Sequence, residues 1–455
     1  MVHRFPNAPI QTNRGLCWNI EKIIDEVHAG LRVCADAAPE GIATIGVDGW
    51  AVDYVRLAPN GAHSAPPFCY RDARTEKAES LVHQAVSPAR LYSLTGIQIL
   101  RLNTIYQLYA DKLAGDDVNA PWLNLPEYLT YRLGGKPAAE YTNATHTGLV
   151  TRETHNWCEE LFQELGLAAS AAPQIVPPGS PAGALHGAFS AHTAFRKTQL
   201  IFPACHDTAS AIAAIPTTGD DWAFISSGTW SLVGTVLRSP CISEESRQLN
   251  FTNLGGVGNQ ICFLKNVNGM WLLAECMAEW ERHGHCWAID QLLERCASLP
   301  APDTLIDVDA PDLLLPGSTT HKINAQLERA GVRRLAIEDA DIPRIANTIF
   351  HSLAARYADV LSSVASLTKK RLKRVFIVGG GSKNTYLNRL TAERTGLEVI
   401  CGAPEGTTIG NFAMQLAALQ GDWSPSTGVS AAAVAKWSED ILAHSIALSR
   451  SGDSY

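Results

Sequence analysis

Strand-like and helix-like hydrophobic patterns alternate along this chain, and the alternation constrains its fold more than any other feature of the sequence. Apolar residues of 19–35 recur at helical spacing, whereas 43–47 and 52–57 are short strand-like runs. A long helical pattern with one apolar face covers 345–367, and another helical stretch covers 409–419. These patterns predict an α/β fold rather than an all-α or an all-β one.

Two strand-like segments in the second half end in small polar residues. At 223–236 an apolar strand, Ser226-Ser227-Gly228-Thr229 and a second apolar strand predict a hairpin. The strand 375–378 is followed by Gly379-Gly380-Gly381-Ser382 and by a helix that starts near Asn384. We interpret the basic run 369–374 as a solvated link between a helix and this strand.

The length of 455 residues predicts two or three folding units at a prior of about 150 residues per domain. A segment rich in Ala, Pro and Gly covers 165–203, and the sequence pattern changes after it. We therefore expect an N-terminal domain over 1–215 and a C-terminal domain over 216–455.

Composition argues against several classes of function. The 37 Lys and Arg against 45 Asp and Glu give a net charge of −8, so a nucleic-acid partner is not expected. No apolar run approaches the roughly 18 residues of a membrane span, and the first residues lack a signal-peptide core. The 11 cysteines include no CxxC pair, which suits reduced thiols in a cytoplasmic protein. His283-Gly284-His285-Cys286 lacks a second ligand pair, so we expect a surface turn there and assign no metal ligands.

A polar cluster stands between the apolar segments 200–203 and 211–215. It contains His206, Asp207 and Thr208. A carboxylate in such surroundings is costly to bury unless it is hydrogen-bonded or has a chemical role. Two interpretations are open, and they are compatible. Asp207 either caps the helix that follows or acts as a base at the edge of a cleft.

Small residues at two places suit a phosphate contact. The triple glycine Gly379, Gly380 and Gly381 precedes a helix, so backbone N–H groups can approach an anion there. Gly228 and Thr229 offer a flexible backbone and a hydroxyl at a hairpin tip. Tight packing of the glycines and an ordinary hairpin turn are the alternative interpretations.

Acidic residues in the strand-rich segment near Trp50 suggest a polar pocket. Asp48 and Asp53 stand there although aspartate is disfavoured in strands. One of them is expected to bind sugar hydroxyls beside the indole, the alternative being an edge carboxylate that faces water. In Tyr70-Arg71-Asp72-Ala73-Arg74, we expect structural ion pairing.

Taken together, the motifs resemble the FGGY carbohydrate kinases, and within them the branch that phosphorylates L-rhamnulose. The resemblance runs from residue 2 to about 420. The matching stretches are GVDGWAVDYV (46–55), CYRDARTEKA (69–78), TGIQILRLNTIYQL (95–108), LPEYLTYRLGG (125–135), YTNATHTGLV (141–150), CHDTASA (205–211), ISSGTWSLVG (225–234), NFTNLGGVGNQICFLKNVNGMWLL (250–273), VGGGSKNTYLNRLTA (378–392) and PEGTTIGN (404–411).

The resemblance implies two actin-like, ribonuclease-H-like lobes with a catalytic cleft between them, which would bind a sugar, ATP and Mg²⁺. Asp207 matches the catalytic base, and the matching substrate contacts are His206, Asp207, Thr208, Asn266, Ala51 and Asp48. Thr229 and Gly380 match contacts to ATP, with Gly228, Gly379 and Gly381 beside them. A monomer or a homodimer is expected, with no nucleic-acid or membrane partner.

The sequence departs from the family pattern in three places. The family opens with a phosphate-binding strand–turn–strand, typically DLGASSGR, which we expect this chain to lack, leaving an open sheet edge. DGWAVD stands for the usual DTWGVD, so the methyl of Ala51 is expected to crowd the sugar, and Ala274 replaces a Gln near ATP. Two alternatives therefore stay open, a kinase for another ketose such as L-fuculose or D-xylulose and an inactive binding remnant.

Overall fold

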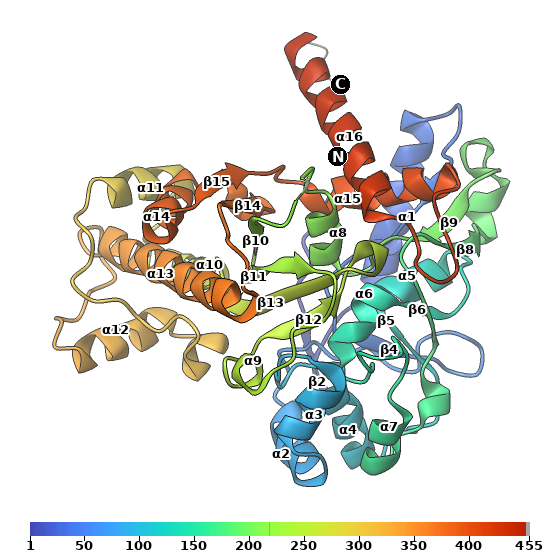
Figure 1. The fold of residues 1–455 in the computed structure, drawn as a ribbon, viewed down its shortest axis with the longest axis horizontal. Coiled ribbons are helices and arrows are strands. Elements are labelled where there is room, and N and C mark those ends of the chain that lie inside the picture. Colours follow the sequence, from blue (N-terminus) through green and yellow to red (C-terminus); the bar gives the residue numbers. More distant parts are fainter. Residues whose placement is uncertain (218, 452–455) are drawn as a thin grey trace. The chain divides into compact units, whose positions relative to one another are not determined.

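The structure is a computed structural model that describes residues 1–217 and 219–451, and it contains two compact units (Figure 1). The chain first leaves unit 1 after Thr217, close to the boundary predicted near residue 215. The sequence patterns did not predict that two later segments return to unit 1. Unit 1 consists of Met1–Thr217, Leu237–Cys262 and the segment that starts at Thr407, and unit 2 of the segment that ends at Val236 together with Phe263–Gly406.

Unit 1 combines short strands with many helices. Its strands are β1 (Ile10–Thr12), β2 (Gly15–Cys17), β3 (Thr44–Ile45), β4 (Tyr54–Arg56), β5 (Trp122–Asn124), β6 (Ala138–Glu140), β7 (Gln174–Val176), β8 (Ser180–Ala184), β9 (Gln199–Phe202) and β12 (Thr252–Gly255). Its helices are α1 (Ile20–Ala37), α2 (Thr75–Ala85), α3 (Pro88–Thr95), α4 (Thr104–Ala114), α5 (Leu125–Arg132), α6 (Tyr141–Ala144), α7 (Glu159–Leu165), α8 (Asp207–Ala213), α9 (Glu244–Gln248), α15 (Gly406–Leu419) and α16 (Ala431–Ser451).

The first helix of unit 1 follows the predicted pattern. Asn19 caps α1, because its side-chain oxygen accepts from the backbone N–H of Lys22 at 3.1 Å. The buried face of α1 includes Ile23, Ile24 and Leu31, which confirms the helix predicted over 19–35. The strands predicted around residues 45 and 55 are present as β3 and β4.

One small sheet of unit 1 leads directly to the predicted site. Its strand order is β3-β9-β8, with β3 parallel to β9 and β9 antiparallel to β8. A single parallel bridge between Gly49 and His206 lies downstream of both β3 and β9. Because the two chains continue in parallel, DGWAVD and the start of α8 are held beside each other. Among the described strands, β3 pairs only with β9.

Unit 2 is built on one continuous sheet. Its strands are β10 (Trp222–Ser227), β11 (Trp230–Leu237), β13 (Ile261–Asn268), β14 (Arg374–Val378) and β15 (Glu398–Cys401), in the order β13-β11-β10-β14-β15. β10 and β11 form the predicted antiparallel hairpin, while β10 is parallel to β14 and β14 to β15. The inner strand β14 is almost wholly buried, as expected for a parallel strand.

Helices cover the sheet of unit 2 (Figure 1). They are α10 (Trp271–Arg282), α11 (Ile289–Ala297), α12 (Thr319–Arg329), α13 (Ile342–Thr368) and α14 (Thr385–Thr395). The long helix α13 packs against α14, α11 and α10. It is the amphipathic helix predicted over 345–367, and the basic run 369–374 follows it as the predicted link to β14.

Candidate functional site

Asp207 is the first residue of α8, and backbone hydrogen bonds fix its position. Its N–H donates to the carbonyl oxygen of Gly49 at 2.8 Å, and the N–H of Gly49 donates to the carbonyl oxygen of Cys205 at 3.0 Å. The hydroxyl of Thr407, in α15, donates to the carbonyl oxygen of Asp207 at 3.3 Å. The start of α8 is therefore held from two sides by segments distant in sequence.

The carboxylate of Asp207 is available to a ligand. Its side chain is 43% exposed, and Oδ1 accepts from the hydroxyl of Thr208 at 3.1 Å. The N-cap position of α8 is His206, and no side-chain cap bond is made, so the interpretation of Asp207 as a helix cap is wrong. A carboxylate that is free of a structural duty and open to solvent suits a general base.

Asp48 lies close enough to Asp207 for their charges to interact. Desolvation, with a smaller contribution from the charge of Asp207, raises the pKa of Asp48 to about 7, although the bond from Asn411 opposes the rise. That bond runs from Nδ2 of Asn411 to Oδ2 of Asp48 at 2.8 Å. A half-buried carboxylate beside a second one predisposes this place to bind a hydroxyl or a cation.

The segment after Trp50 has a constrained backbone. Ala51 is buried, and Val52 has a φ of 70°, a left-handed conformation that is rare for a β-branched residue. The carbonyl oxygen of Val52 accepts from Thr104 Oγ1 at 2.7 Å and from Gln107 Nε2 at 3.2 Å. These bonds from α4 hold the strained turn and with it the orientation of Ala51.

Asp53 is fully buried and holds two tryptophans. Its Oδ2 accepts from Nε1 of Trp18 at 2.6 Å and from Nε1 of Trp50 at 2.9 Å, and the two rings lie 4.6 Å apart. Burial raises the pKa of Asp53 to about 6, although these bonds favour the charged form. The expectation of an edge carboxylate that faces water is therefore wrong for Asp53. Sequence reasoning missed Trp18, whose place beside Trp50 depends on the tertiary fold.

In unit 2, the two predicted phosphate loops follow neighbouring parallel strands. Gly228 and Thr229 form the exposed tip after β10, and Gly379 follows β14. The tip is held by backbone bonds from Met270 to Gly228 at 3.1 Å and from Trp271 to Thr229 at 3.2 Å. The carboxyl ends of parallel strands are where α/β sheets bind ligands, so this edge of unit 2 suits a phosphate chain.

The three glycines have different surroundings. Gly379 has a φ of 83°, and a Cβ there would lie 2.9 Å from the carbonyl oxygen of Ser227. A Cβ at Gly381 would overlap the hydroxyl of Ser227, whereas a Cβ at Gly380 would meet nothing within 4 Å. Tight packing thus explains Gly379 and Gly381 but not Gly380. The nearby hydroxyl of Ser382 is buried and has no hydrogen-bond partner among the described residues.

Asn266, the remaining predicted substrate contact, is half-buried on β13 in unit 2. Unit 1 itself brings together Asp48, His206, Asp207 and Thr208, with Ala51 in the adjoining turn. Among the described residues no three His, Cys, Asp or Glu side chains are grouped as ligands for a metal ion. A metal that arrives with phosphate oxygens and water needs only one or two carboxylates, and Asp48 fits that requirement.

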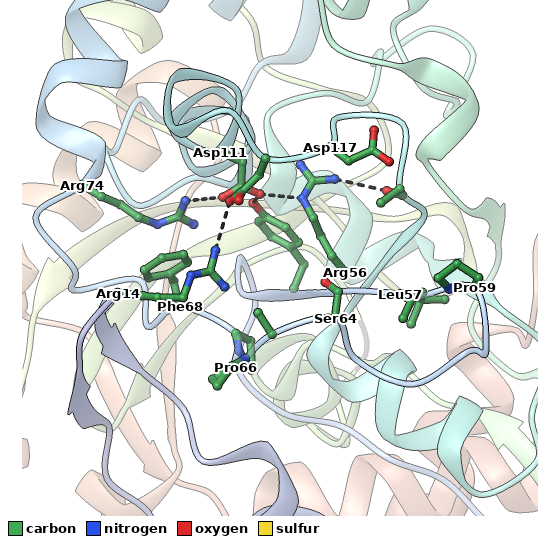
Figure 2. A pocket seen from close by; sticks show the side chains of 16 residues that line it. Arg14, Arg56, Leu57, Pro59, Ser64, Pro66, Phe68, Arg74, Asp111 and Asp117 are labelled. Carbon is green, nitrogen blue, oxygen red and sulfur yellow. Dashed lines mark hydrogen bonds and ion pairs between the residues drawn. The ribbon is translucent and has the colours of Figure 1, made fainter.

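A second hollow in unit 1 is separate from these residues. It is a pocket of about 540 Å³ beside Phe68, and none of the predicted site residues is among its described lining residues (Figure 2). Arg56 and Arg74 converge on the buried Asp111, at 2.7 and 2.5 Å. This confirms structural ion pairing for Arg74, although the partner is Asp111 rather than Asp72.

Family comparisons cover most of the chain. Residues 4–214 match the N-terminal domain of the FGGY family of carbohydrate kinases, and residues 223–419 match its C-terminal domain. No helix in the described part of the chain combines the length and apolar character of a transmembrane segment.

Curated relatives agree with these matches. A rhamnulokinase of Halalkalibacterium halodurans is 34% identical over 92% of this chain and 88% of the relative. A rhamnulokinase of Oceanobacillus iheyensis is 35% identical over 92% of this chain and 87% of the relative. A rhamnulokinase of Bacillus subtilis is 32% identical over 92% of this chain and 84% of the relative.

Solved structures share the fold. A xylulose kinase of Lactobacillus acidophilus has a TM-score of 0.74 at 17% identity, covering 99% of this chain and 93% of the neighbour. A glycerol kinase of Plasmodium falciparum with ADP also has a TM-score of 0.74, at 11% identity with the same coverage. These neighbours confirm the predicted α/β fold class with two actin-like lobes.

Proposed function

The chain belongs to the FGGY family of carbohydrate kinases, and we propose that it transfers the γ-phosphoryl group of ATP to the primary hydroxyl of L-rhamnulose, giving L-rhamnulose 1-phosphate. The observation that carries the proposed substrate is the match to proteins named rhamnulokinase, at 32% to 36% identity over about nine-tenths of this chain. The geometry of Asp207 supports the proposed chemistry.

Asp207 is the proposed catalytic base. Its carboxylate is exposed enough to meet a sugar hydroxyl, and its Oδ2 has no hydrogen-bond partner in the described part of the protein. As the hydroxyl oxygen attacks the γ-phosphorus, its proton passes to this carboxylate and ADP leaves. His206 and Thr208, which adjoin Asp207, are the proposed sugar contacts in unit 1, together with Asp48 and Ala51, and Asn266 is the proposed contact in unit 2.

The loops of unit 2 are the proposed ATP site. Gly380 is the glycine whose backbone has open space beside it, so its N–H can approach a phosphate without displacing protein atoms. Thr229 offers a hydroxyl at the exposed tip of the neighbouring hairpin, with Gly228 beside it. Phosphoryl transfer depends chiefly on positioning and charge neutralisation, which such loops can provide.

We propose Mg²⁺ as the accompanying cation, with Asp48 as the carboxylate that would hold it. When bound, Mg²⁺ neutralises phosphate charge. The raised pKa of Asp48 supports this assignment, because a cation would relieve the unfavourable charge of a desolvated carboxylate beside Asp207.

The proposed location is the cytoplasm. The 11 cysteines are all thiols, and this supports a reducing, cytoplasmic setting.

The test is sugar-dependent release of ADP by the purified chain with ATP and Mg²⁺. We expect a higher kcat/KM for L-rhamnulose than for L-fuculose or D-xylulose. A preference for either of the other ketoses would support the alternative kinase assignment. Sugar or ATP binding by calorimetry without turnover of any ketose would instead support the binding-remnant alternative.

A further inference from the structure

A second histidine lies behind the proposed catalytic residues. His146 stands in the 3₁₀ turn Thr145–Thr147, and both it and His206 are buried. Nε2 of His146 lies 3.0 Å from Nδ1 of His206, within hydrogen-bond distance, and the two ring centroids are 4.0 Å apart. Sequence analysis did not single out His146, because the two histidines are 60 residues apart in the chain.

The other ring nitrogen of His206 faces the proposed base. Its Nε2 lies 3.5 Å from Oδ1 of Asp207. A proton on Nε2 would face a carboxylate oxygen, whereas a lone pair there would face negative charge. The favourable arrangement is therefore His206 with its proton on Nε2 and a lone pair on Nδ1. That lone pair requires a donor, and the ring nitrogen beside it belongs to His146.

Because the two rings share a hydrogen bond, one of the two facing nitrogens must accept, so the two rings cannot both be charged. Burial lowers the pKa of His146 well below its usual range and also lowers the pKa of His206, although the charge of Asp207 opposes the change at His206. The turn that carries His146 is itself anchored. Nδ2 of Asn103 donates to the carbonyl oxygen of His146 at 3.1 Å, and the N–H of Gly255 donates to the hydroxyl of Thr145 at 3.1 Å.

We propose that His146 is a positioning residue for phosphoryl transfer, which donates its Nε2–H to His206 and thereby fixes His206 as the tautomer that presents Nε2–H to Oδ1 of Asp207. The inference rests on the proposed function of Asp207. Oδ1 then accepts from the hydroxyl of Thr208 and faces Nε2–H of His206 at 3.5 Å, which leaves Oδ2 to take the proton of the sugar hydroxyl. A histidine tautomer is set in general by the hydrogen bond that the other ring nitrogen makes.

The first arm of the test reads the tautomer without any turnover. The full chain is labelled with ¹⁵N-histidine, and long-range ¹H–¹⁵N correlation spectra are recorded, with His206→Asn used to assign the His206 signals. We expect wild-type His206 to be a single neutral tautomer protonated at Nε2. In His146→Leu we expect exchange between the two neutral tautomers. His206 protonated at Nδ1 in the wild type would overturn the proposal.

The second arm compares two variants of His146 by kinetics. His146→Leu removes the donor, whereas His146→Gln keeps a side-chain N–H near the position of Nε2. Removing the partner that orients a metal-ligating histidine typically costs roughly 10- to 100-fold, and by analogy we expect a loss of that size in kcat for His146→Leu, with the KM for ATP unchanged. His146→Gln is expected to recover a large part of the loss. Equal kcat values for both variants and the wild type would overturn the proposal.

A matched control separates positioning from general destabilisation. His83 also makes a hydrogen bond through a ring nitrogen, from Nε2 to the hydroxyl of Tyr106 at 2.8 Å. His83→Leu should lower the melting temperature without the kcat loss of His146→Leu. If the wild type phosphorylates no ketose, the proposed function fails while the tautomer result still decides the His146–His206 arrangement.

Discussion

The N–H of Asp207 donates to the carbonyl oxygen of Gly49 at 2.8 Å, and this bond joins two segments separated by more than 150 residues. The segment around Gly49 carries Asp48 and Ala51, while Asp207 opens α8. Because the joining atoms belong to the backbone, the relative position of sugar-contacting and proton-accepting groups depends little on side-chain rotamers. A displacement of α8 would therefore alter the whole proposed site in unit 1.

The contact between α8 and α15 offers a direct test of this dependence. A Cβ at Gly410 would overlap the backbone carbonyl oxygen of Ser210, so Gly410→Ala must shift one helix. Overpacking of this kind costs roughly 1–3 kcal/mol, and we expect a lower melting temperature together with a lower kcat. Gly30→Ala is the control, because its Cβ meets only His3 at 3.6 Å and helical Gly-to-Ala changes are neutral or stabilising. Equal melting temperatures for Gly410→Ala and wild type would contradict the packing argument.

Substitutions in the triple glycine can distinguish a role in nucleotide binding from a role in packing. Gly380→Ala adds a methyl group to open space, so thermal unfolding should be unchanged while the KM for ATP rises if the backbone there meets the nucleotide. Gly381→Ala would collide with Ser227, so it should lower the melting temperature even without ATP. Differential scanning fluorimetry and ATP titrations measure both effects. An unchanged KM for ATP in a folded Gly380→Ala variant would refute the assignment of Gly380.

A buried pair of glutamates makes stability depend on pH. Burial raises the pKa of Glu127 from 4.5 to about 8, with a further contribution from the charge of Glu140. The folded protein therefore holds this proton more tightly than the unfolded chain does. The stability that this bound proton contributes is present below about pH 4.5. It decreases as the pH rises to about 8, and above that value this contribution is absent.

Glu127→Gln should remove this loss. At about 1.4 kcal/mol per pKa unit, the advantage of the variant over wild type should grow to a few kcal/mol between pH 5 and pH 8 and then level off. Melting temperatures measured at unit pH intervals test this. Glu164→Gln, which alters an exposed ion pair with Arg90, should show almost none of the trend. A constant difference between Glu127→Gln and wild type at all pH values would rule out the proposed proton linkage.

Asp53 should stabilise the fold through the hydrogen bonds that it accepts from Trp18 and Trp50. Its two oxygens accept from the N–H groups of Trp18, Trp50 and Gln107 as well as from the backbone of Tyr70, and an amide cannot accept at both positions. Asp53→Asn leaves a buried donor unpaired, which costs roughly 1–3 kcal/mol. Urea unfolding followed by circular dichroism measures the loss. Asp116→Asn, at a partly exposed pair with Arg14, should cost less than about 1 kcal/mol, and equal losses in the two variants would contradict the account.

Local patterns predicted the elements whose residues interact mainly with near neighbours. The helix α13 and the paired strands around Gly228 could be predicted from the sequence, because helix and hairpin geometry repeat within a few residues. Local patterns also singled out Asp207, His206 and Thr208, which stay predicted site residues, because a polar cluster between apolar segments is itself unusual. Local patterns did not predict contacts between distant segments. Trp18 meets Asp53, and His146 meets His206, only after the sheets and turns of unit 1 have formed.

The same limit explains two other differences. A helix-capping role for Asp207 is compatible with its sequence neighbours, and only the backbone dihedral angles show that His206 occupies the cap position. Glu127 lies in a helix whose apolar and polar residues give no clear buried face, yet it is completely buried. Burial of this kind is decided by the elements that pack around α5, which a local pattern does not contain.

Asp207 is proposed to take the proton of a ketose hydroxyl during phosphoryl transfer from ATP. The most direct measurement compares ADP release by the wild type and by Asp207→Asn, with ATP, Mg²⁺ and L-rhamnulose, alongside sugar binding by calorimetry. General-base catalysis contributes typically 10²- to 10⁴-fold, so we predict a loss of at least about 100-fold in kcat with sugar binding largely retained. Wild-type turnover by a folded Asp207→Asn variant would contradict the claim.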